Sequence, residues 1–386
     1  MNKKPDLLID LTRLVNRFLD GLFPTGVDRV TLAYLNHYEG RARVFFLLKT
    51  KYNIFSQKKS IKLFQLLKSP DFTKKKLILL LSKGVLLGHL EKDIEGCVFF
   101  NTDHRGLNQP SYQKLLRRLK VKPVYMLHDL IPIQYPEYCR HNEDFKHKQR
   151  LNTMLSTAVG IITNSQDTLK HLKNYAQQFQ YSLPSTLVAP LSVPQLVLTN
   201  PQRPLQSPYF LMLSTIEPRK NHWILLQVWK KLYQKLGDKT PRLVIIGRRG
   251  WKCGNVIDLL ERSVELSQVI IELNICDDET LTQYLKHAQA LLFPSFSEGF
   301  GLPLIEAFLF DTPVILSDLD VFKEIAGNIP EYIDPIDGKK WQEMIIEYSK
   351  NDSLRRQNQI NQIKNFSIPT WQEHFNRVDL FIEQFN

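Results

Sequence analysis

The chain has 386 residues, of which 43% are hydrophobic and 11% aromatic, so it can form two well-cored domains and is not globally disordered. Lysine and arginine total 51 against 39 aspartates and glutamates, a formal net charge of +12 at pH 7. Such a balance favours anionic partners: nucleotides, nucleic acid or an acidic membrane surface. The four cysteines are far apart and form no CxxC, which argues against a disulfide scaffold or a zinc site and fits a reducing compartment.

The chain shows no targeting or membrane-spanning pattern. In the N-terminal MNKKPDLLIDLTR, Asp6 and Asp10 enclose too few apolar residues for a signal-peptide core. The longest apolar tract, LILLLSKGVLLGHL at 77–90, is shorter than a membrane span and contains Lys83 and His89. We therefore expect a cytoplasmic protein.

Short apolar runs alternate with longer helical patterns along the whole chain. The runs of the first half are DLLIDLT, ARVFFLL, GCVFFNT, KPVYMLHD and AVGIITNS, and those of the second half are PYFLMLST, RLVIIGRR, QVIIEL, ALLFPS and TPVILS. Helical patterns, including 222–236 and 280–290, lie between them. Strands without strict alternation, spaced by helices, predict parallel sheets covered on both faces.

The best linker candidate is VPQLVLTNPQRPLQSPY at 193–209, which is rich in proline and lacks a clear period. We therefore predict two doubly wound α/β domains, residues 1–198 and 199–368. Ligands of such sheets bind beyond the carboxyl ends of the strands. The residues that follow the apolar runs are Asp10 to Arg13, His128-Asp129, Asn164-Ser165, Thr215 to Asn221, Gly247 to Gly250 and Ser295 to Glu298.

The segment FPSFSEGFGLPLIEAF, residues 293–308, places a glycine-rich bend between Glu298 and Glu306. Pro303 suits the first turn of a following helix, whose free N–H groups at 300–304 would face an anion. The glutamates would hold hydroxyls, Glu306 those of a ribose and Glu298 those of a second sugar. The piece suits a sugar nucleotide, although a plain loop with a helix cap would look the same.

The segment LSTIEPRKNHWILL at 213–226 places Arg219 and Lys220 after a strand, where a helix begins. Adjacent cations there can neutralise a diphosphate and stabilise its charge as a bond to it breaks. Alone they would be a solvated charge pair. Together with the glycine loop they predict a phosphate clamp.

Two motifs of the first half also lie where a ligand could be reached. His128, in YMLHDLIPIQYPEY, follows a strand, where it is either a structural histidine or one that meets a ligand. In LFPTGVDRV, Gly26 precedes a helix that begins at Val27. Turn chemistry or close approach of a ligand would each explain this glycine.

Two acidic segments and one basic segment could have a structural role or a solvent-exposed position instead of binding a ligand. DLD at 318–320 and CDDE at 276–279 resemble a metal motif of another sugar-transferase fold, but Asp318 is expected to begin or cap a helix, so no metal site is predicted. Lys58, Lys59 and 74–76 lie beside apolar residues. They form either a solvated face or a membrane-surface patch.

These motifs together resemble a known family. PSFSEGFGLPLIEA, with seven residues between Glu298 and Glu306, resembles the E-x7-E signature of retaining, nucleotide-sugar-dependent glycosyltransferases of family 4 with the GT-B fold. STIEPRKN is similar to that family's phosphate-binding segment. HDLIPIQYPEY and PTGVDRV resemble its branch of mannosyltransferases in bacterial lipopolysaccharide O-antigen and capsule synthesis. The resemblance covers roughly residues 7 to 330.

The resemblance implies two Rossmann-like domains facing a central cleft, with a C-terminal helix at 369–386 completing the first domain. It implies that Glu306 binds the ribose and that Glu298 and His128 bind the donor sugar. Arg219 and Lys220 would bind the diphosphate, together with the N–H groups of Phe300, Gly301 and Leu302. Gly26 would lie near the phosphate and the acceptor. Thr215 stands where many members have an arginine, so Arg219 is expected to substitute. Thr215 and Gly247 complete the nucleotide-sugar site.

The resemblance also implies front-side displacement, in which the leaving diphosphate oxygen accepts the acceptor's proton, without a protein nucleophile, metal or cofactor. We expect transfer of a sugar, with mannose from GDP-mannose as the first candidate, to a lipid-linked or growing polysaccharide acceptor. The alternatives are a UDP- or dTDP-sugar donor, an epimerase or phosphorylase of the same fold, and a non-catalytic glycan- or lipid-carrier-binding subunit. Nucleic-acid binding is not expected, whereas peripheral contact with the inner face of the cytoplasmic membrane is compatible with the basic charge.

Overall fold

The structure, a computed structural model, describes residues 7–22, 24–48, 51–69, 71–85, 94–193, 198–200, 202–274 and 276–385. The chain divides into two compact units. The first comprises residues 1–133, 142–191 and 370–386, and the second comprises 134–141 and 192–369. This division differs from the predicted one at three places: the boundary lies at 191/192 instead of 198/199, residues 134–141 join the second unit, and the chain returns to the first unit at residue 370 instead of 369.

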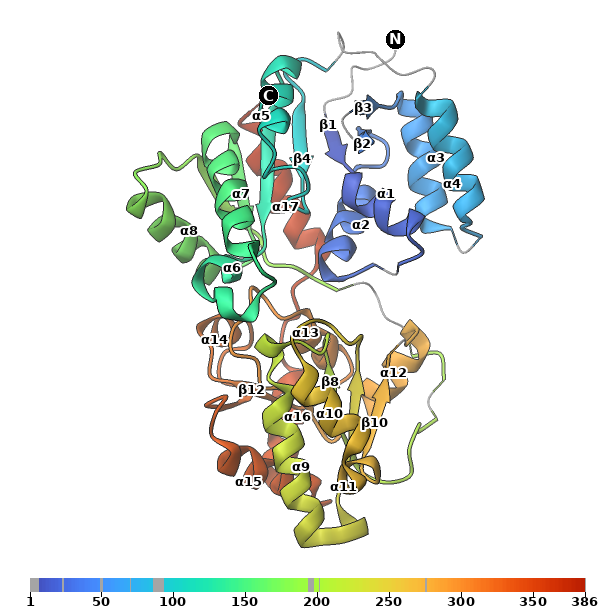
Figure 1. Ribbon diagram of the computed structural model, residues 1–386, viewed down its shortest axis with the longest axis vertical. Helices are drawn as coiled ribbons and strands as arrows, with labels where there is room; N and C mark the ends of the chain where they lie inside the picture. Colours follow the sequence, from blue (N-terminus) through green and yellow to red (C-terminus); the bar gives the residue numbers. More distant parts are fainter. Residues whose placement is uncertain are drawn as a thin grey trace. The chain divides into compact units, whose positions relative to one another are not determined.

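The first unit is built on a seven-stranded sheet (Figure 1). Its strands are β1 (Leu7–Asp10), β2 (Ala42–Leu48), β3 (Lys51–Ile54), β4 (Val98–Asn101), β5 (Lys122–Leu127), β6 (Gly160–Thr163) and β7 (Ser185–Val188). Their order is β3-β2-β1-β4-β5-β6-β7, and all pairs are parallel except β2 with β3. The predicted strands are present. The sequence reading missed β3 and β7, two edge strands that are short and weakly apolar.

Helices cover both faces of this sheet, as the unbroken apolar character of its strands requires. They are α1 (Thr12–Leu19), α2 (Gly26–Tyr38), α3 (Gln57–Lys68), α4 (Lys74–Val85), α5 (Pro110–Leu119), α6 (Ile131–Gln134), α7 (Glu143–Thr157), α8 (Gln166–Gln178) and α17 (Trp371–Glu383). The 3₁₀ turn η2 (Pro136–Tyr138), which follows α6 in the chain, belongs to the second unit. No helix of the described residues is long and apolar enough to cross a membrane.

The C-terminal helix α17 is part of the first unit, and Figure 1 shows it in red among the elements of the first half of the chain. Its buried His374 contacts the hydroxyl of Tyr34 through Nε2 at 3.1 Å and the carbonyl of Pro190 through Nδ1 at 3.0 Å. Tyr38 donates its hydroxyl to Asp379 at 2.9 Å. These polar contacts fix the register of α17 on α2.

The second unit has a six-stranded parallel sheet of order β10-β9-β8-β11-β12-β13. Its strands are β8 (Tyr209–Leu213), β9 (Arg242–Ile246), β10 (Ile270–Leu273), β11 (Leu291–Phe293), β12 (Val314–Ser317) and β13 (Glu331–Ile333). Its helices are η3 (Pro218–Lys220), α9 (His222–Leu236), η4 (Gly237–Lys239), α10 (Gly254–Arg262), α11 (Val264–Ser267), α12 (Asp278–His287), α13 (Leu302–Leu309), α14 (Asp320–Ala326), α15 (Gly338–Ser349) and α16 (Leu354–Lys364). Helix α9 covers the predicted 222–236, whereas α12 ends at His287 instead of residue 290.

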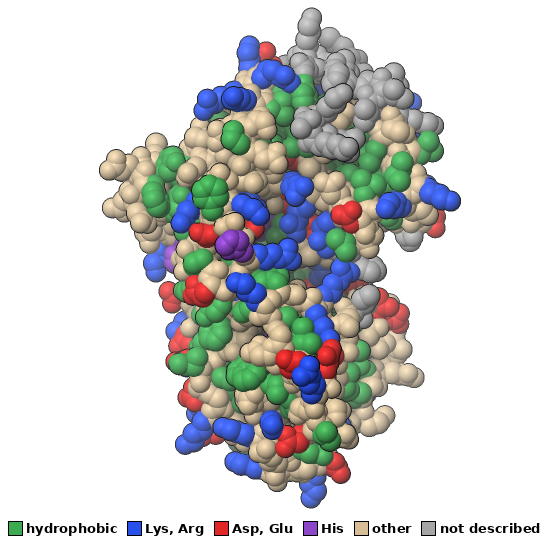
Figure 2. All heavy atoms as spheres, in the orientation of Figure 1, with side chains coloured by type: hydrophobic (Ala, Val, Ile, Leu, Met, Phe, Trp, Pro, Cys, Tyr) green, Lys and Arg blue, Asp and Glu red, His purple; other side chains and the backbone are tan. Residues whose placement is uncertain are grey.

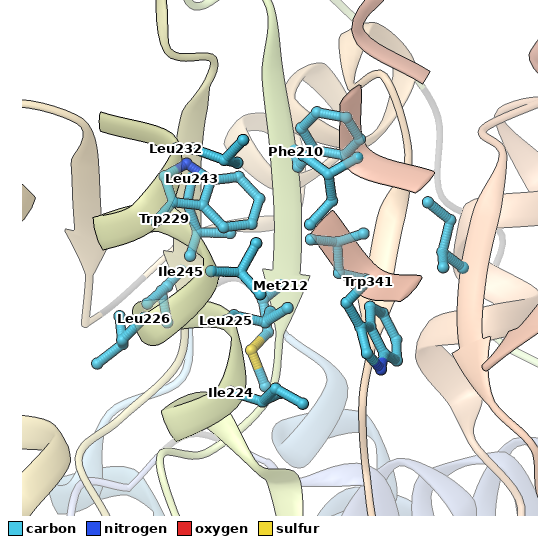
Figure 3. Close-up of a cluster of buried hydrophobic side chains, with 14 of the residues drawn as sticks. Phe210, Met212, Ile224, Leu225, Leu226, Trp229, Leu232, Leu243, Ile245 and Trp341 are labelled. Atoms are coloured by element: carbon cyan, nitrogen blue, oxygen red, sulfur yellow. The ribbon is translucent and has the colours of Figure 1, made fainter. Parts of the chain in front are cut away.

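Strand β8 shows why its sequence is apolar at every position. Tyr209 and Leu211 enter the hydrophobic cluster on one face of the sheet, and Phe210 and Met212 enter the cluster on the other face. Figure 3 shows the second of these clusters, in which side chains of α9, including Trp229, point toward the strand residues. The buried indole of Trp229 also donates to the carbonyl of Pro241 at 2.8 Å.

The strand order places the binding edge of each sheet. In the second unit β8 lies between β9 and β11, so the chain leaves β8 toward one side and later returns to the other. In the first unit β1 lies between β2 and β4 in the same way. A ligand-binding crevice forms where the connections diverge at the carboxyl ends of such strands. The loops that follow β8 and β11, and those that follow β1 and β4, therefore lie at these crevices.

Candidate functional site

The loops that follow β8 and β11 are joined to each other by hydrogen bonds. The amide of Phe296 donates to the carbonyl of Arg219 at 2.9 Å, and Arg219 Nη1 donates to the carbonyl of Ser297 at 2.5 Å. The loop after β8 ends at Asn221, which has a left-handed φ of 56° and donates Nδ2 to the carbonyl of Pro335 at 2.7 Å. The segments 213–226 and 293–308, from which the sugar-nucleotide site was predicted, thus contact each other at the carboxyl edge of the sheet.

Three predicted residues meet in a cluster of buried charges at this edge. Glu298 lies between two cations, with Oε2 at 2.9 Å from Arg219 Nη1 and Oε1 at 2.5 Å from Lys220 Nζ. Glu217, which the sequence reading quoted without assigning it a role, pairs with Arg219 Nη2 at 2.9 Å. The side chain of Glu298 is 7% exposed and that of Lys220 12%. The only sequence signal for Glu217 is a carboxylate two residues from the basic pair.

Burial and ion pairing act against each other in this cluster. Burial alone would raise the pKa of Glu298, but Arg219 and Lys220 outweigh it and lower that pKa to about 2. Burial lowers the pKa of Lys220, although Glu298 opposes this, and burial raises the pKa of Glu217 against the two cations. Glu298 is therefore ionised throughout the neutral range.

The glycine-rich bend leads directly into α13, as predicted. Gly301 precedes the helix with φ 103°, a conformation that side chains disfavour, and a Cβ there would lie 2.7 Å from the Phe322 ring. Pro303 lies in the first turn, where its missing N–H costs nothing. Phe300 is buried before the helix, and the buried Glu306 lies about one turn inside it. The ligand roles of Phe300, Gly301, Leu302 and Glu306 stay predictions.

Gly247 lies where two backbones run side by side. The amide of Ser214 donates to Ile246 O at 3.0 Å, and that of Ile216 donates to Arg248 O at 2.9 Å. A Cβ on Gly247 would lie 1.9 Å from the Ser214 carbonyl oxygen, so only glycine fits. This packing explains the glycine without a ligand. Thr215 lies in the same paired stretch, and the predicted ligand contacts of both residues stay predictions.

His128 lies at the carboxyl edge of the first unit's sheet. It is 8% exposed, its Nε2 contacts the carbonyl of Thr102 at 2.7 Å, and burial lowers its pKa, so it is neutral at pH 7. Asn164 donates to the His128 carbonyl at 2.9 Å. Part of its role is therefore structural.

Gly26 is the first residue of α2, which follows β1 and α1. Asp28, fully buried, accepts from the amide and hydroxyl of Thr25 at 2.7 and 2.6 Å. It also pairs with Arg13 and Arg17, each at 2.9 Å. Further along α2, the hydroxyl of Thr31 contacts that of Thr102 at 2.8 Å, beside the carbonyl that His128 binds. The structure therefore places α2, through Thr31, beside the residue that His128 contacts.

Two buried carboxyls at the same edge were not singled out as a pair from the sequence. Asp10, at the end of β1, accepts from the amide of Thr12 at 2.8 Å and from the hydroxyl of Tyr112, and burial raises its pKa to about 6. Asp103, after β4, accepts from the amide of Arg105 at 2.9 Å. Burial, and then the charge of Asp10, raises the pKa of Asp103 to about 7. Each lies at or just after the end of a strand, the signal that could have grouped them.

The two acidic segments have structural roles. Asp277 is the N-cap of α12, and its Oδ1 accepts from the amide of Thr280 at 2.8 Å. Asp318 pairs with Lys323, and α14 begins at Asp320 after Leu319, so the prediction that Asp318 begins or caps a helix was wrong. Among the described residues, no group of three or more histidine, cysteine, aspartate or glutamate side chains is placed to hold a metal ion.

Residues 199–365 match the family model described as glycosyl transferases group 1. The matched stretch covers most of the second unit. The chain is similar to a serotype-specific mannosyltransferase, WbdA, of Escherichia coli, with 28% identity over 254 residues, 61% of this chain and 31% of that protein. It is 33% identical to O-antigen chain mannosyltransferase B of Escherichia coli over 147 residues, 38% of each chain. It is 32% identical to O-antigen chain mannosyltransferase RfbU of Salmonella typhimurium over 36% of this chain and 37% of that protein. The chain thus spans about a third of the length of these relatives.

Solved structures match most of the chain. The HepE protein of Anabaena, crystallised with UDP and glucose, has a TM-score of 0.69 at 15% identity and covers 98% of this chain and 99% of its own. Sucrose-phosphate synthase of Thermosynechococcus elongatus has a TM-score of 0.59 at 16% identity, covering 82% of this chain and 80% of its own. Together with the two parallel sheets, these matches confirm the predicted GT-B fold class. That the domains face a central cleft stays a prediction.

Proposed function

We propose that this protein is a retaining glycosyltransferase that moves a sugar from a nucleotide sugar to a lipid-linked or growing polysaccharide acceptor in bacterial surface glycan synthesis. The observation that supports it most is the buried cluster of Glu298, Arg219 and Lys220. It lies at the carboxyl ends of the neighbouring strands β8 and β11, where the chain connections leave in opposite directions. Two cations held there by a carboxylate are suited to a ligand that carries both a diphosphate and hydroxyl groups.

The donor is bound by the second unit. Lys220 and Arg219 neutralise the diphosphate, assisted by the N–H groups at 300–302 that open α13. Glu306 accepts hydrogen bonds from the ribose, and Glu298 accepts from hydroxyls of the transferred sugar. Because Glu298 is ionised at neutral pH, it is an acceptor only, which suits sugar hydroxyls. Glu298 also keeps the two cations in place before the diphosphate arrives.

The reaction we propose needs no protein nucleophile. A bond forms between the acceptor oxygen and the anomeric carbon, and the bond from that carbon to the diphosphate oxygen breaks. The proton of the acceptor hydroxyl passes to the departing oxygen on the same face. Lys220 and Arg219 stabilise the negative charge that develops there, which is an electrostatic contribution of the kind that dominates many enzyme sites. Because neutral His128 donates its Nε2 proton to the carbonyl of Thr102, its Nδ1 can only accept a hydrogen bond, which suits a hydroxyl of the donor sugar.

Mannose from GDP-mannose is the first donor to test, because three of the relatives are mannosyltransferases. The purified protein should be incubated with GDP-mannose, UDP-glucose and a dTDP-sugar, and both donor hydrolysis and thermal stabilisation measured. We expect GDP-mannose to be hydrolysed fastest. If only a UDP- or dTDP-sugar is hydrolysed, that sugar nucleotide is the donor, and the proposed type of reaction is unchanged. Binding without hydrolysis or transfer, even with glycoside acceptors, would favour the non-catalytic subunit.

Substitution of the clamp tests the chemistry directly. Lys220→Ala and Arg219→Ala should each lower turnover about 10²- to 10³-fold, the usual cost of removing one charge-stabilising donor. Full activity in both variants would show that the diphosphate binds elsewhere.

We also propose that the reaction is metal-independent, with these cations in place of a divalent ion. Activity should survive EDTA, and a strict metal requirement would refute this part.

Contact with an anionic membrane surface is proposed for the pair α3 and α4. Ile78 and Leu79 of α4 are about half exposed, next to the exposed Lys74 to Lys76, and Figure 2 shows hydrophobic and basic side chains side by side over this part of the first unit. An exposed apolar pair beside lysines suits a lipid surface. The protein would then lie peripherally at the cytoplasmic face, where a lipid-linked acceptor is available. Ile78→Glu with Leu79→Glu should abolish sedimentation with phosphatidylglycerol vesicles, and unchanged sedimentation would contradict the proposal.

A further inference from the structure

A short segment from the first half of the chain packs against the loop that carries Glu298. Residues 134–141, which include η2, belong to the second unit. The ring of Tyr138 stacks on that of Phe296, with centroids 5.3 Å apart and planes inclined by 9°. Phe296 lies two residues before Glu298. An aromatic side chain far away in sequence therefore contacts the glutamate-bearing loop.

Tyr138 is itself held in place by a third loop of the second unit. The indole Nε1 of Trp251 donates to the carbonyl of Tyr138 at 3.2 Å. The guanidinium of Arg140 lies 4.7 Å from the centre of the Trp251 ring, a favourable cation–π position. Trp251 follows Gly247 to Gly250 in the loop after β9. The ring of Tyr138 is thus anchored through its own backbone and not only through its contact with Phe296.

Phe296 connects the Tyr138 ring to the charged cluster of Arg219 and Glu298. Its amide donates to the carbonyl of Arg219 at 2.9 Å, and the next residue, Ser297, accepts from the Arg219 guanidinium at 2.5 Å. The same guanidinium pairs with Glu298 at 2.9 Å. A shift of Phe296 would therefore disturb two hydrogen bonds and the ion pair together.

We infer that Tyr138 is a positioning residue, whose ring fixes Phe296 and thereby the geometry of Arg219 and Glu298. It contacts neither of the charged side chains in any interaction described above, so its effect on chemistry is indirect. The effect on turnover rests on the proposed function, whereas the effect on the order of the loop does not.

The first test measures the loop without reference to activity. In Tyr138→Ala, hydrogen exchange of the peptide that contains the Phe296 amide should become about 2- to 12-fold faster, because a stacked aromatic pair contributes on the order of 0.5–1.5 kcal/mol. Tyr138→Phe keeps the ring and should restore the wild-type rate. Phe145→Ala removes a ring that is 58% exposed on α7 and serves as the control. Unchanged exchange in Tyr138→Ala, or failure of Tyr138→Phe to restore it, would overturn the inference.

The second test separates positioning from binding and from folding. Tyr138→Ala should lower kcat for GDP-mannose hydrolysis about 2- to 12-fold, while the Kd for GDP, used as the probe, stays within about twofold. In a Phe296→Ala background the same substitution should have no further effect. Additive losses would show that Tyr138 acts elsewhere and would overturn the inference, as would a loss of GDP binding equal to the loss of kcat. If the wild type neither hydrolyses a nucleotide sugar nor transfers its sugar to a glycoside acceptor, the proposed function fails, and the exchange result alone decides the role of Tyr138.

Discussion

Glu298→Gln removes the negative charge between Arg219 and Lys220 while keeping the size of the side chain. The pKa of Glu298 falls from 4.5 to about 2 in the folded protein, and about 1.36 kcal/mol for each tenfold change in proton affinity gives about 3 kcal/mol. With the Glu298 side chain 7% exposed, solvent screening is slight, and the figure agrees with the roughly 3–5 kcal/mol lost when a buried ion pair is broken. We expect the free energy of unfolding to fall by about 3 kcal/mol at pH 7.

The pH dependence of this loss has a definite sign. Because the folded-state pKa lies below the unfolded one, the contribution of Glu298 is fully present above about pH 4.5 and disappears as the pH falls toward about 2. The stabilities of the wild type and Glu298→Gln should therefore converge in acid. At neutral pH, the variant should lose turnover but bind GDP at least as tightly as the wild type, since a carboxylate no longer competes with the diphosphate for Lys220.

Thermal unfolding of the whole chain, with GDP-mannose hydrolysis in parallel, measures both effects. At about 2–4 °C per kcal/mol for a domain of this size, the transition of the second unit should fall by about 6–12 °C. Asp318→Asn is the matched control, because Asp318 and Lys323 form a pair that is about half exposed, and such pairs contribute at most about 1 kcal/mol. A transition within 1 °C of the wild type together with normal hydrolysis would refute the role assigned to Glu298.

Three further outcomes follow from particular contacts. Gly247→Ala, whose Cβ would lie 1.9 Å from the Ser214 carbonyl oxygen, should unfold or insolubilise the second unit, whereas Gly254→Ala, with nothing within 4 Å, should fold normally; equal expression and melting of the two would contradict this. Burial lowers the pKa of His374 to about 4, so the unfolded chain takes up a proton first and stability falls as the pH drops from about 6.5 to 4. Hydrogen exchange of α17, corrected for intrinsic rates, should then be faster at pH 5 than at pH 7.5, and pH-independent protection would exclude His374 as the cause. Glu306→Ala should weaken GDP binding about tenfold in calorimetry, and unchanged affinity would remove its proposed ribose contact.

Many of the strands and helices could be predicted from the sequence, because they depend on local patterns of residues. Apolar runs such as YFLML are buried on both faces in any doubly wound sheet, so their strand character follows from composition alone. The start of α13 was predictable for the same reason, since Pro303 and Gly301 restrict their own backbone. The edge strands β3, β7 and β13 were missed because they are short and partly exposed, so their pairing comes from the neighbouring strand.

The sequence by itself determined which residues we propose as ligands of a nucleotide sugar, because the required chemical groups and the glycine-rich bend are local features of the chain. Only the tertiary structure decided how these residues are held. It placed Glu217 on Arg219, the Gly247 backbone against Ser214, and Tyr138 on Phe296. The physical reason is that a charge, a clash or a ring contact depends on distances between segments that lie far apart in sequence, and these distances follow from the order of the strands.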